Sequence, residues 1–172
     1  MARETAFPKP GQFEIRSFPM FQLSNGKQAE ILVCEARMVL RTGEARGTGS
    51  TRQIDVDVLE WVATGNSRLL GGPVEFRMTE GGPRRKSWVR AGRKGDLPGQ
   101  ARFALRYQVT TPQGTVKDLS GVALGPIRSF PPRGDVFRID KVLQLGNLEV
   151  LPVACACPAD LDFVISLPRS LA

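Results

Sequence analysis

Apolar and polar side chains alternate through most of this chain of 172 residues, and this alternation constrains its fold more than any other feature. The clearest example is Arg102–Thr111, in which Phe103, Leu105, Tyr107 and Val109 occupy every second position. Successive side chains of a β-strand point to opposite faces of the sheet. This segment therefore predicts a strand with one apolar face turned toward a core.

Similar segments recur along the chain, with short connections rich in turn residues. The sequence contains 18 glycines and 13 prolines without any fixed period, which indicates many turns. The pattern favours an all-β fold, either an antiparallel β-sandwich or a closed β-barrel of about eight to nine strands, with little or no helix. The expected strands span residues 13–23, 27–42, 53–64, 73–79, 102–111, 115–124, 136–145, 148–155 and 161–167.

Three of these segments carry local ambiguities. Residues 27–42 contain many helix-forming side chains, but they also alternate, and we favour a strand because the neighbouring segments are β. Pro19 is expected to confine its strand to a sheet edge or to split it. The alternation changes phase at Val58 and Leu59, which predicts a β-bulge near Glu60 and Trp61.

The length of the chain suits one domain. We expect residues 1–12 to form an extended N-terminal arm, residues 13–172 to form a single β domain, and residues 81–100 to form a long basic loop within it. The three cysteines, the charged N-terminus and the lack of a long apolar run lead us to expect a cytoplasmic protein without a transmembrane segment.

The pentapeptide Ile15–Pro19 recurs as Ile127–Pro131. Two equivalent strand ends, one in each half of an internally symmetric fold, would explain the repeat. The residues that flank the two copies differ, which favours coincidence.

The sequence contains no histidine, and it shows no phosphate-binding loop or nucleophile motif. Histidine serves most acid–base, triad and transition-metal sites, so the chemistry open to this chain is narrow. Cys155 and Cys157 have only Cys34 as a further thiol, so core packing is favoured over a zinc site. Asp55 and Asp57 share one strand face and are expected to be solvated. We predict no metal and no cofactor, and whether the protein is an enzyme stays open.

The net charge of +7 is concentrated in one segment. Residues 83–95 contain six positive side chains, no acid and one tryptophan. Arginine, lysine and tryptophan can bind phosphate, stack on bases or contact an acidic surface. A solvated loop without a partner is the simplest interpretation, followed by contact with an acidic protein or another subunit. The candidate binding residues are Arg84, Arg85, Lys86, Trp88, Arg90, Arg93 and Lys94.

A closed barrel would offer a different kind of site, because eight strands can enclose one small ligand. Tyr107 lies on the apolar face of its strand, and Trp61 lies beside the expected bulge. Glu35 and Arg37 share a face that we expect to line the solvent side, and they would form an acid–cation pair in a polar cavity if this face instead points into a barrel. These four residues are the candidate pocket residues.

Three functions remain in order of preference. The first is a non-catalytic β-scaffold that contacts a protein partner or another subunit through its loops. The second is a small-molecule-binding β-barrel, acting as a carrier or as a cofactor-independent cyclase or isomerase. The third is binding of nucleic acid or anionic lipid through the basic segment.

Overall fold

The computed structural model describes residues 5–80 and 86–158. These residues form eleven antiparallel β-strands and one short 3-10 helix, η1, at Gly49–Thr51, with no α-helix among them. The predicted all-β fold is confirmed. The strands are β1 Gly11–Ser24, β2 Ala29–Val33, β3 Glu35–Thr42, β4 Gln53–Ser67, β5 Gly72–Met78, β6 Ser87–Gly92, β7 Gly95–Thr111, β8 Gly114–Ile127, β9 Val136–Ile139, β10 Leu143–Leu145 and β11 Leu148–Ala156.

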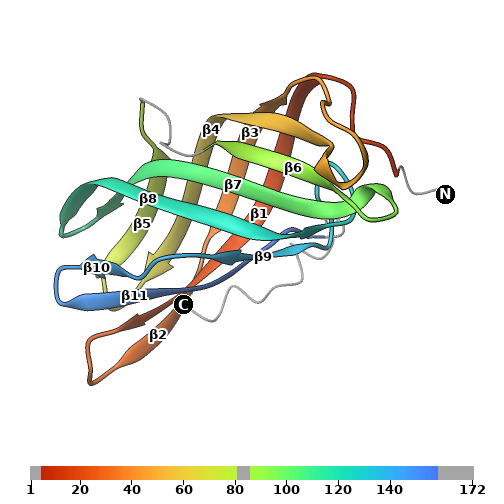
Figure 1. Ribbon diagram of the computed structural model, residues 1–172. Coiled ribbons are helices and arrows are strands. Elements are labelled where there is room, and N and C mark those ends of the chain that lie inside the picture. Colours follow the sequence, from red (N-terminus) through yellow and green to blue (C-terminus); the bar gives the residue numbers. More distant parts are fainter. Residues whose placement is uncertain (1–4, 81–85, 159–172) are drawn as a thin grey trace.

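The sheet closes on itself, because β11 pairs with β1. The closed ring runs through β1, β3, β4, β5, β7, β8, β9 and β11, so the fold is a β-barrel (Figure 1). β6 fills the space between β4 and β7 at the end of the barrel away from β5. β2 and β10 lie outside the ring and extend from β1 and β11.

Alternating apolar side chains from every wall of the ring fill the interior. On β7, Phe103, Tyr107 and Val109 are buried and Leu105 is partly buried, as its alternation predicts. Inside the closed ring, side chains of strands that are far apart in the sequence pack against these residues of β7. The largest fully buried side chains include Leu23, Leu40, Ile54, Leu70, Val74, Phe76, Val89, Ile127, Phe137 and Val150.

The predicted bulge is present in β4. Val39 of β3 pairs with Glu60 and Leu40 pairs with Val58, so Leu59 has no partner in this ladder. The segment expected at residues 27–42 is β, as favoured, but it begins at Ala29 and forms two strands that separate at Cys34. The break allows the chain to pass from the extension outside the ring into the ring itself.

Pro19 neither splits its strand nor confines it to a sheet edge, which corrects the expectation, because β1 has neighbouring strands on both sides. β1 is continuous, and Pro19 stands where its neighbour on one side changes from β3, which pairs up to Ser17, to β2, which pairs from Met20. Proline lacks an N–H group and cannot donate to a ladder. The change of partner at this point makes the loss of one donor tolerable.

Most of the expected basic loop over residues 81–100 is instead a β-hairpin, which corrects the sequence prediction. Residues 81–85 are outside the described part of the chain, and β6 and β7 follow, joined by Arg93 and Lys94. Ser87 and Val89 are buried, whereas Arg90 is exposed on the opposite face. The strand was missed because its alternation is short and is flanked by glycines and charged residues.

The expected strand at 136–145 is divided into β9 and β10, and Lys141 between them has a φ of 69°. Such a left-handed conformation ends regular pairing.

The two pentapeptide copies differ in structure. Ile15–Pro19 lies within β1, whereas Ile127 ends β8 and Ser129–Pro131 forms a bend. Symmetry-related strand ends therefore do not explain the repeat. The expected strand at 161–167 is outside the described residues.

The described part of the N-terminal arm contacts the same chain. The Leu97 amide donates to the Thr5 carbonyl at 2.9 Å, and the Phe7 amide donates to the Asp96 carboxylate at 2.9 Å. Arg52 lies 5.9 Å from the centroid of the Phe7 ring and also binds Asp96 at 3.0 Å. These contacts attach residues 5–7 to the start of β7. The part of the chain that the structure describes contains no helix that could span a lipid bilayer.

Candidate ligand pocket inside the barrel

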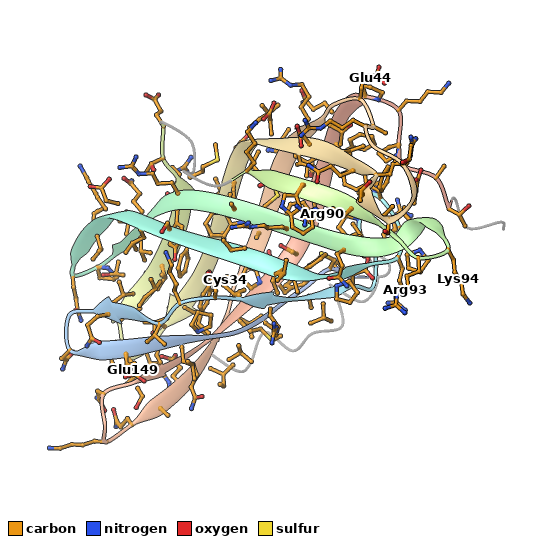
Figure 2. All side chains as sticks on the ribbon, viewed as in Figure 1. Cys34, Glu44, Arg90, Arg93, Lys94 and Glu149 are labelled. Atoms are coloured by element: carbon orange, nitrogen blue, oxygen red, sulfur yellow. The ribbon has the colours of Figure 1, made fainter. Side chains whose placement is uncertain are left out.

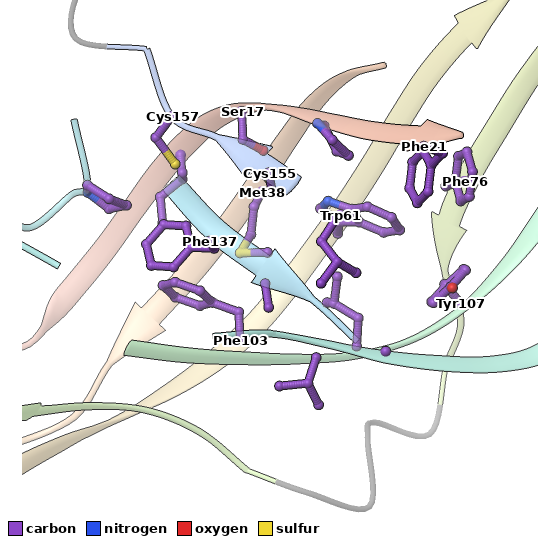
Figure 3. Close-up of a pocket in the computed structure, with 18 residues that line it drawn as sticks. Ser17, Phe21, Met38, Trp61, Phe76, Phe103, Tyr107, Phe137, Cys155 and Cys157 are labelled. Carbon is purple, nitrogen blue, oxygen red and sulfur yellow. The ribbon is translucent and has the colours of Figure 1, made fainter. Parts of the chain in front are cut away.

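A cavity of about 70 Å³ remains inside the barrel (Figure 3). Eighteen uncharged residues line it, and they come from β1, β3, β4, β5, β7, β8, β9, β11 and the connections next to them. It is partly open to solvent, and its volume is about half that of an engineered apolar cavity that admits benzene. Its principal lining side chains are Ser17, Phe21, Met38, Trp61, Phe76, Phe103, Tyr107, Phe137, Cys155 and Cys157.

Aromatic rings form one wall of the cavity. Phe21 and Phe76 stack with their centroids 4.9 Å apart. Trp61 meets Tyr107 edge to face at 5.6 Å and Phe76 at 6.2 Å. Such arrangements add attraction beyond the burial of apolar area, and they fix the orientation of each ring. Four strands, β1, β4, β5 and β7, thus contribute to one rigid aromatic wall.

Two thiols and one hydroxyl lie on another part of the lining. Cys155 and Cys157 come from the end of β11 and its continuation, and the Ser17 hydroxyl of β1 has a lowering effect on the pKa of Cys155 that is smaller than the effect of burial. Burial raises the pKa of Cys155 to about 11, and burial followed by the charges of Cys155 and Asp135 also raises the pKa of Cys157. Both thiols are therefore neutral near pH 7 and act as apolar, polarizable surface.

Tyr107 brings a hydroxyl group to the cavity. Its side chain is only 8% exposed, and its oxygen has no hydrogen-bond partner among the described residues. A methyl group on Gly121 would lie 3.9 Å from this oxygen and 3.9 Å from an Asp140 carboxylate oxygen. Burial, with a further contribution from the negative charge of Asp140, raises the pKa of Tyr107 to about 12. The phenol thus stays protonated at neutral pH.

The wall of the barrel is thin where β8 meets β9. The ladder contains only two residue pairs, Ala123 with Ile139 and Leu124 with Arg138. Asp140 extends the contact, since its carboxylate accepts the Val122 N–H at 2.6 Å and its own N–H donates to the Val122 carbonyl at 3.0 Å. Val122 and Ile139 border both the cavity and a groove on the outside. This short ladder separates the cavity from solvent.

Two of the four predicted pocket residues lie in the cavity wall, namely Trp61 and Tyr107. Glu35 and Arg37 do not, because both are exposed on the solvent side, which is the alternative favoured for them from the sequence. The guanidinium of Arg37 binds Glu14 at 3.2 Å and Glu60 at 3.3 Å on the outer face, and Arg37 holds the pKa of Glu14 below its usual value. Glu35 and Arg37 point outward because the alternate positions of β3, which carry small and apolar side chains such as Met38, point into the barrel.

The predicted basic residues do not share one loop. Arg84 and Arg85 are outside the described residues, Lys86 precedes β6, and Arg93 and Lys94 form the turn after it (Figure 2). Arg90 lies over the ring of Trp88, with its Cζ 4.0 Å from the centroid. Trp88 borders the outer groove of about 540 Å³, together with Arg102, Leu124, Arg138 and Asp140.

The acidic pair on β4 is engaged in ion pairs. Asp55 binds Arg46 at 2.6 Å and Asp57 binds Arg41 at 3.3 Å, both near the barrel surface. The expectation that these carboxylates belong to a solvated face agrees with this arrangement, because each already has a cationic partner.

Sequence reasoning missed most of the lining. Ser17, Met38, Phe103, Phe137 and Gly121 were not singled out, and Cys155 and Cys157 were interpreted as core residues. Alternation shows that such side chains point inward. It carries no information on whether they meet one another or leave a space, so the sequence held no signal for the cavity itself.

No protein-family model matches the chain, and no curated protein matches it significantly. A solved structure, that of DynF from the dynemicin biosynthesis pathway of Micromonospora chersina, is similar in fold with a TM-score of 0.59. The two chains are 15% identical over 92% of this chain and 86% of DynF. At this identity the likeness establishes a shared barrel fold.

Proposed function

We propose that this protein binds an apolar small molecule inside the barrel. The observation that carries the proposal is the cavity, which all strands of the closed ring surround with uncharged side chains. Ligand sites are typically concave and mostly apolar, with few polar groups. The similar fold of DynF, a protein of a biosynthetic pathway, supports the second of the three functions considered from the sequence.

The chemistry of the lining suits such a ligand. An apolar molecule leaves water and gains contact with aromatic rings, two neutral thiols and the thioether of Met38. Methionine is flexible and fills irregular spaces, so it can move aside for a ligand larger than the cavity of about 70 Å³. We propose binding and transport or protection of the ligand, without a chemical step.

The two tryptophans provide a direct test, because Trp61 lines the cavity and Trp88 lies on the outer face. In Trp88→Phe, Trp61 is the only tryptophan, and titration with isopropylbenzene should change its emission to a saturating level. The matched variant Trp61→Phe, which reports only Trp88, should give no saturating change. A response confined to Trp88 would place the ligand on the outside and contradict the proposal.

A second pair of variants tests the location through volume. Ala123 faces the cavity from β8, and Leu124 beside it faces the outer groove. Ala123→Leu should weaken binding of isopropylbenzene at least about tenfold by filling the cavity. Leu124→Phe enlarges a neighbouring side chain on the opposite face and should leave binding unchanged. Circular dichroism establishes that both variants are folded, and equal binding by both would rule out the barrel interior.

We propose self-association as a second function, in line with the partner contact favoured by the sequence. Gln22 of β1 pairs with Ile31 on one side and with Leu151 on the other. Ile31 and Leu151 are 51% and 43% exposed, and Val153 is 49% exposed. Large exposed apolar areas commonly mark interaction sites. Light scattering should give a mass above one chain for the natural protein and a lower mass for Ile31→Lys. A single-chain mass at all concentrations contradicts this proposal alone.

A further inference from the structure

We infer that the molecule bound in the barrel is neutral and carries a hydrogen-bond acceptor, such as a ketone oxygen, that receives the hydroxyl proton of Tyr107. This inference rests on the proposed binding function and specifies the chemical class of the ligand. It follows from the Tyr107 hydroxyl in a mostly apolar wall, in which Ser17 carries the other hydroxyl, and from the nearby charge of Asp140.

The hydroxyl of Tyr107 makes no hydrogen bond with the residues that the structure describes. The side chain as a whole is only 8% exposed, and it belongs to the cavity lining. Its oxygen is not among the fully buried polar atoms without a partner, which are Thr79 Oγ1 and Arg102 Nε. The hydroxyl is therefore free to donate a hydrogen bond to an acceptor on a molecule in the cavity.

The direction of the hydroxyl is fixed by its neighbours. The Tyr107 ring packs edge to face on Trp61 at 5.6 Å, and it is tilted against Phe76 at 6.1 Å. These contacts hold a phenol whose pKa of about 12 keeps it protonated. A donor that is oriented before the ligand arrives contributes to affinity without an additional cost for ordering the side chain.

The same region disfavours an anion. The Asp140 carboxylate oxygen and the Tyr107 oxygen are each 3.9 Å from a methyl group placed on Gly121, so both lie close to Gly121, although Asp140 borders the outer groove rather than the cavity. The Val122 N–H holds Asp140 in place at 2.6 Å. Lys141, the nearest cation in sequence, donates to Ser120 at 2.9 Å and does not line the cavity. Arg102 and Arg138 border the outer groove with Asp140, but no charged side chain lines the cavity itself. A carboxylate bound at Tyr107 would therefore lose water without meeting a cation in the cavity lining.

Three molecules of nearly equal shape separate these effects: acetophenone, isopropylbenzene and benzoate. They differ in whether the branch from the ring is a ketone, a hydrocarbon or a carboxylate. Calorimetric titration of the natural protein at pH 7 should give acetophenone a dissociation constant about five times lower than that of isopropylbenzene, as expected for one net hydrogen bond. Benzoate should bind more weakly than isopropylbenzene.

Two variants assign the preference to residues. Tyr107→Phe removes only the hydroxyl, and it should bring acetophenone to the affinity of isopropylbenzene while leaving the hydrocarbon unchanged. Asp140→Asn keeps an oxygen for the Val122 N–H but removes the charge. It should improve benzoate binding by about twofold to fivefold, because the charge is exposed and partly screened, and it should leave acetophenone unchanged.

The outcomes distinguish this inference from the function on which it rests. Equal affinities for acetophenone and isopropylbenzene, or a ketone preference that survives Tyr107→Phe, would overturn the inference while binding itself stands. Tighter binding of benzoate than of acetophenone would also overturn it. If isopropylbenzene and acetophenone both fail to bind, the proposed function is wrong and the inference is lost with it.

Discussion

The three cysteine side chains differ in their relation to the cavity although all are shielded from water. Burial is the main cause that raises the pKa of Cys34 to about 12 and that of Cys155 to about 11, and it also raises the pKa of Cys157. Only Cys155 and Cys157 line the cavity. Since the thiolate is the reactive form, all three thiols should be slow to react in the folded protein.

We therefore predict that a disulfide reagent at pH 8 labels the folded protein at least about tenfold more slowly than the urea-unfolded protein. Isopropylbenzene should further slow labelling of Cys155 and Cys157, and it should leave Cys34 unaffected. Mass spectrometry of proteolytic fragments measures each site. Equal protection of Cys34 would indicate a global effect on opening rather than occupation of the cavity.

Glu30 is a buried carboxylate that caps the turn between β4 and β5. It accepts hydrogen bonds from the Ser67 hydroxyl at 2.7 Å and from the Arg68 and Leu69 amides at 2.9 and 3.2 Å. Burial by itself would raise the pKa of Glu30, but these hydrogen bonds outweigh it and hold the pKa below 4.5. The ionised form is thus favoured by folding, and its contribution is present above the unfolded pKa and lost as the pH falls through the folded one.

Glu30→Gln should accordingly lower the free energy of unfolding by about 1–3 kcal/mol at pH 7. The difference from the natural protein should shrink as the pH falls below 4.5, because Glu30 then becomes neutral in both states. Urea denaturation at several pH values measures this. Glu35→Gln, a change at an exposed position, is the matched control. A difference that is independent of pH would show that the charge of Glu30 is unimportant.

The β6–β7 hairpin depends on close backbone approach at Gly99. A methyl group there would overlap the carbonyl oxygen of Arg90 and lie 2.9 Å from that of Asp96. Gly99→Ala should therefore reduce the free energy of unfolding by about 1–3 kcal/mol, since backbone atoms must shift. Gly43→Ala is the control, because its methyl group would only reach the Asp55 carbonyl at 3.9 Å. Similar urea midpoints for both variants would mean that the hairpin adapts freely.

Individual strands were predictable because their side chains alternate between a filled interior and solvent. β7 and β8 and the bulge in β4 were all anticipated. β6 was not, because six residues between glycine-rich and charged segments provide a weak pattern. The sequence also left the choice between a β-sandwich and a β-barrel open. It depends on the pairing of β1 with β11, and these strands are joined by hydrogen bonds between residues more than a hundred positions apart.

Of the residues that line the candidate site, only Trp61 and Tyr107 were predicted as pocket residues from the sequence. Tyr107 was identified because it is the one tyrosine of the sequence and lies on an apolar strand face, and Trp61 because it lies beside the expected bulge. The aliphatic, phenyl and thiol side chains beside them follow the same alternation as the packed core. Glu35 and Arg37 were kept as pocket candidates beside the favoured solvent-side position, because the sequence leaves open which face of β3 points inward until its partners are known. Their positions show that register, which the sequence leaves open, decides which residues reach the cavity.

The closed ring explains how this chain retains a cavity without a large loss of stability. Hydrogen bonds between neighbouring strands of the closed ring pair the backbone N–H and C=O groups, so the side chains that face the interior need only be apolar. The ring has its shortest ladders around β9, which pairs with β8 and with β11 through two residue pairs each, and the β8–β9 ladder borders the cavity. A ligand that contacts both strands should therefore stabilise the section where pairing contributes least.

This coupling gives a prediction for the whole molecule. A ligand that binds only the folded protein raises the free energy of unfolding, by about 1.4 kcal/mol at ten times its Kd. Isopropylbenzene at that concentration should raise the Tm by about 3–6 °C for a chain of this length. Differential scanning calorimetry should show the increase in the natural protein and in Leu124→Phe, and should show none in Ala123→Leu. An equal increase in Ala123→Leu would mean that the stabilising site lies outside the barrel, because only the interior is filled by that substitution.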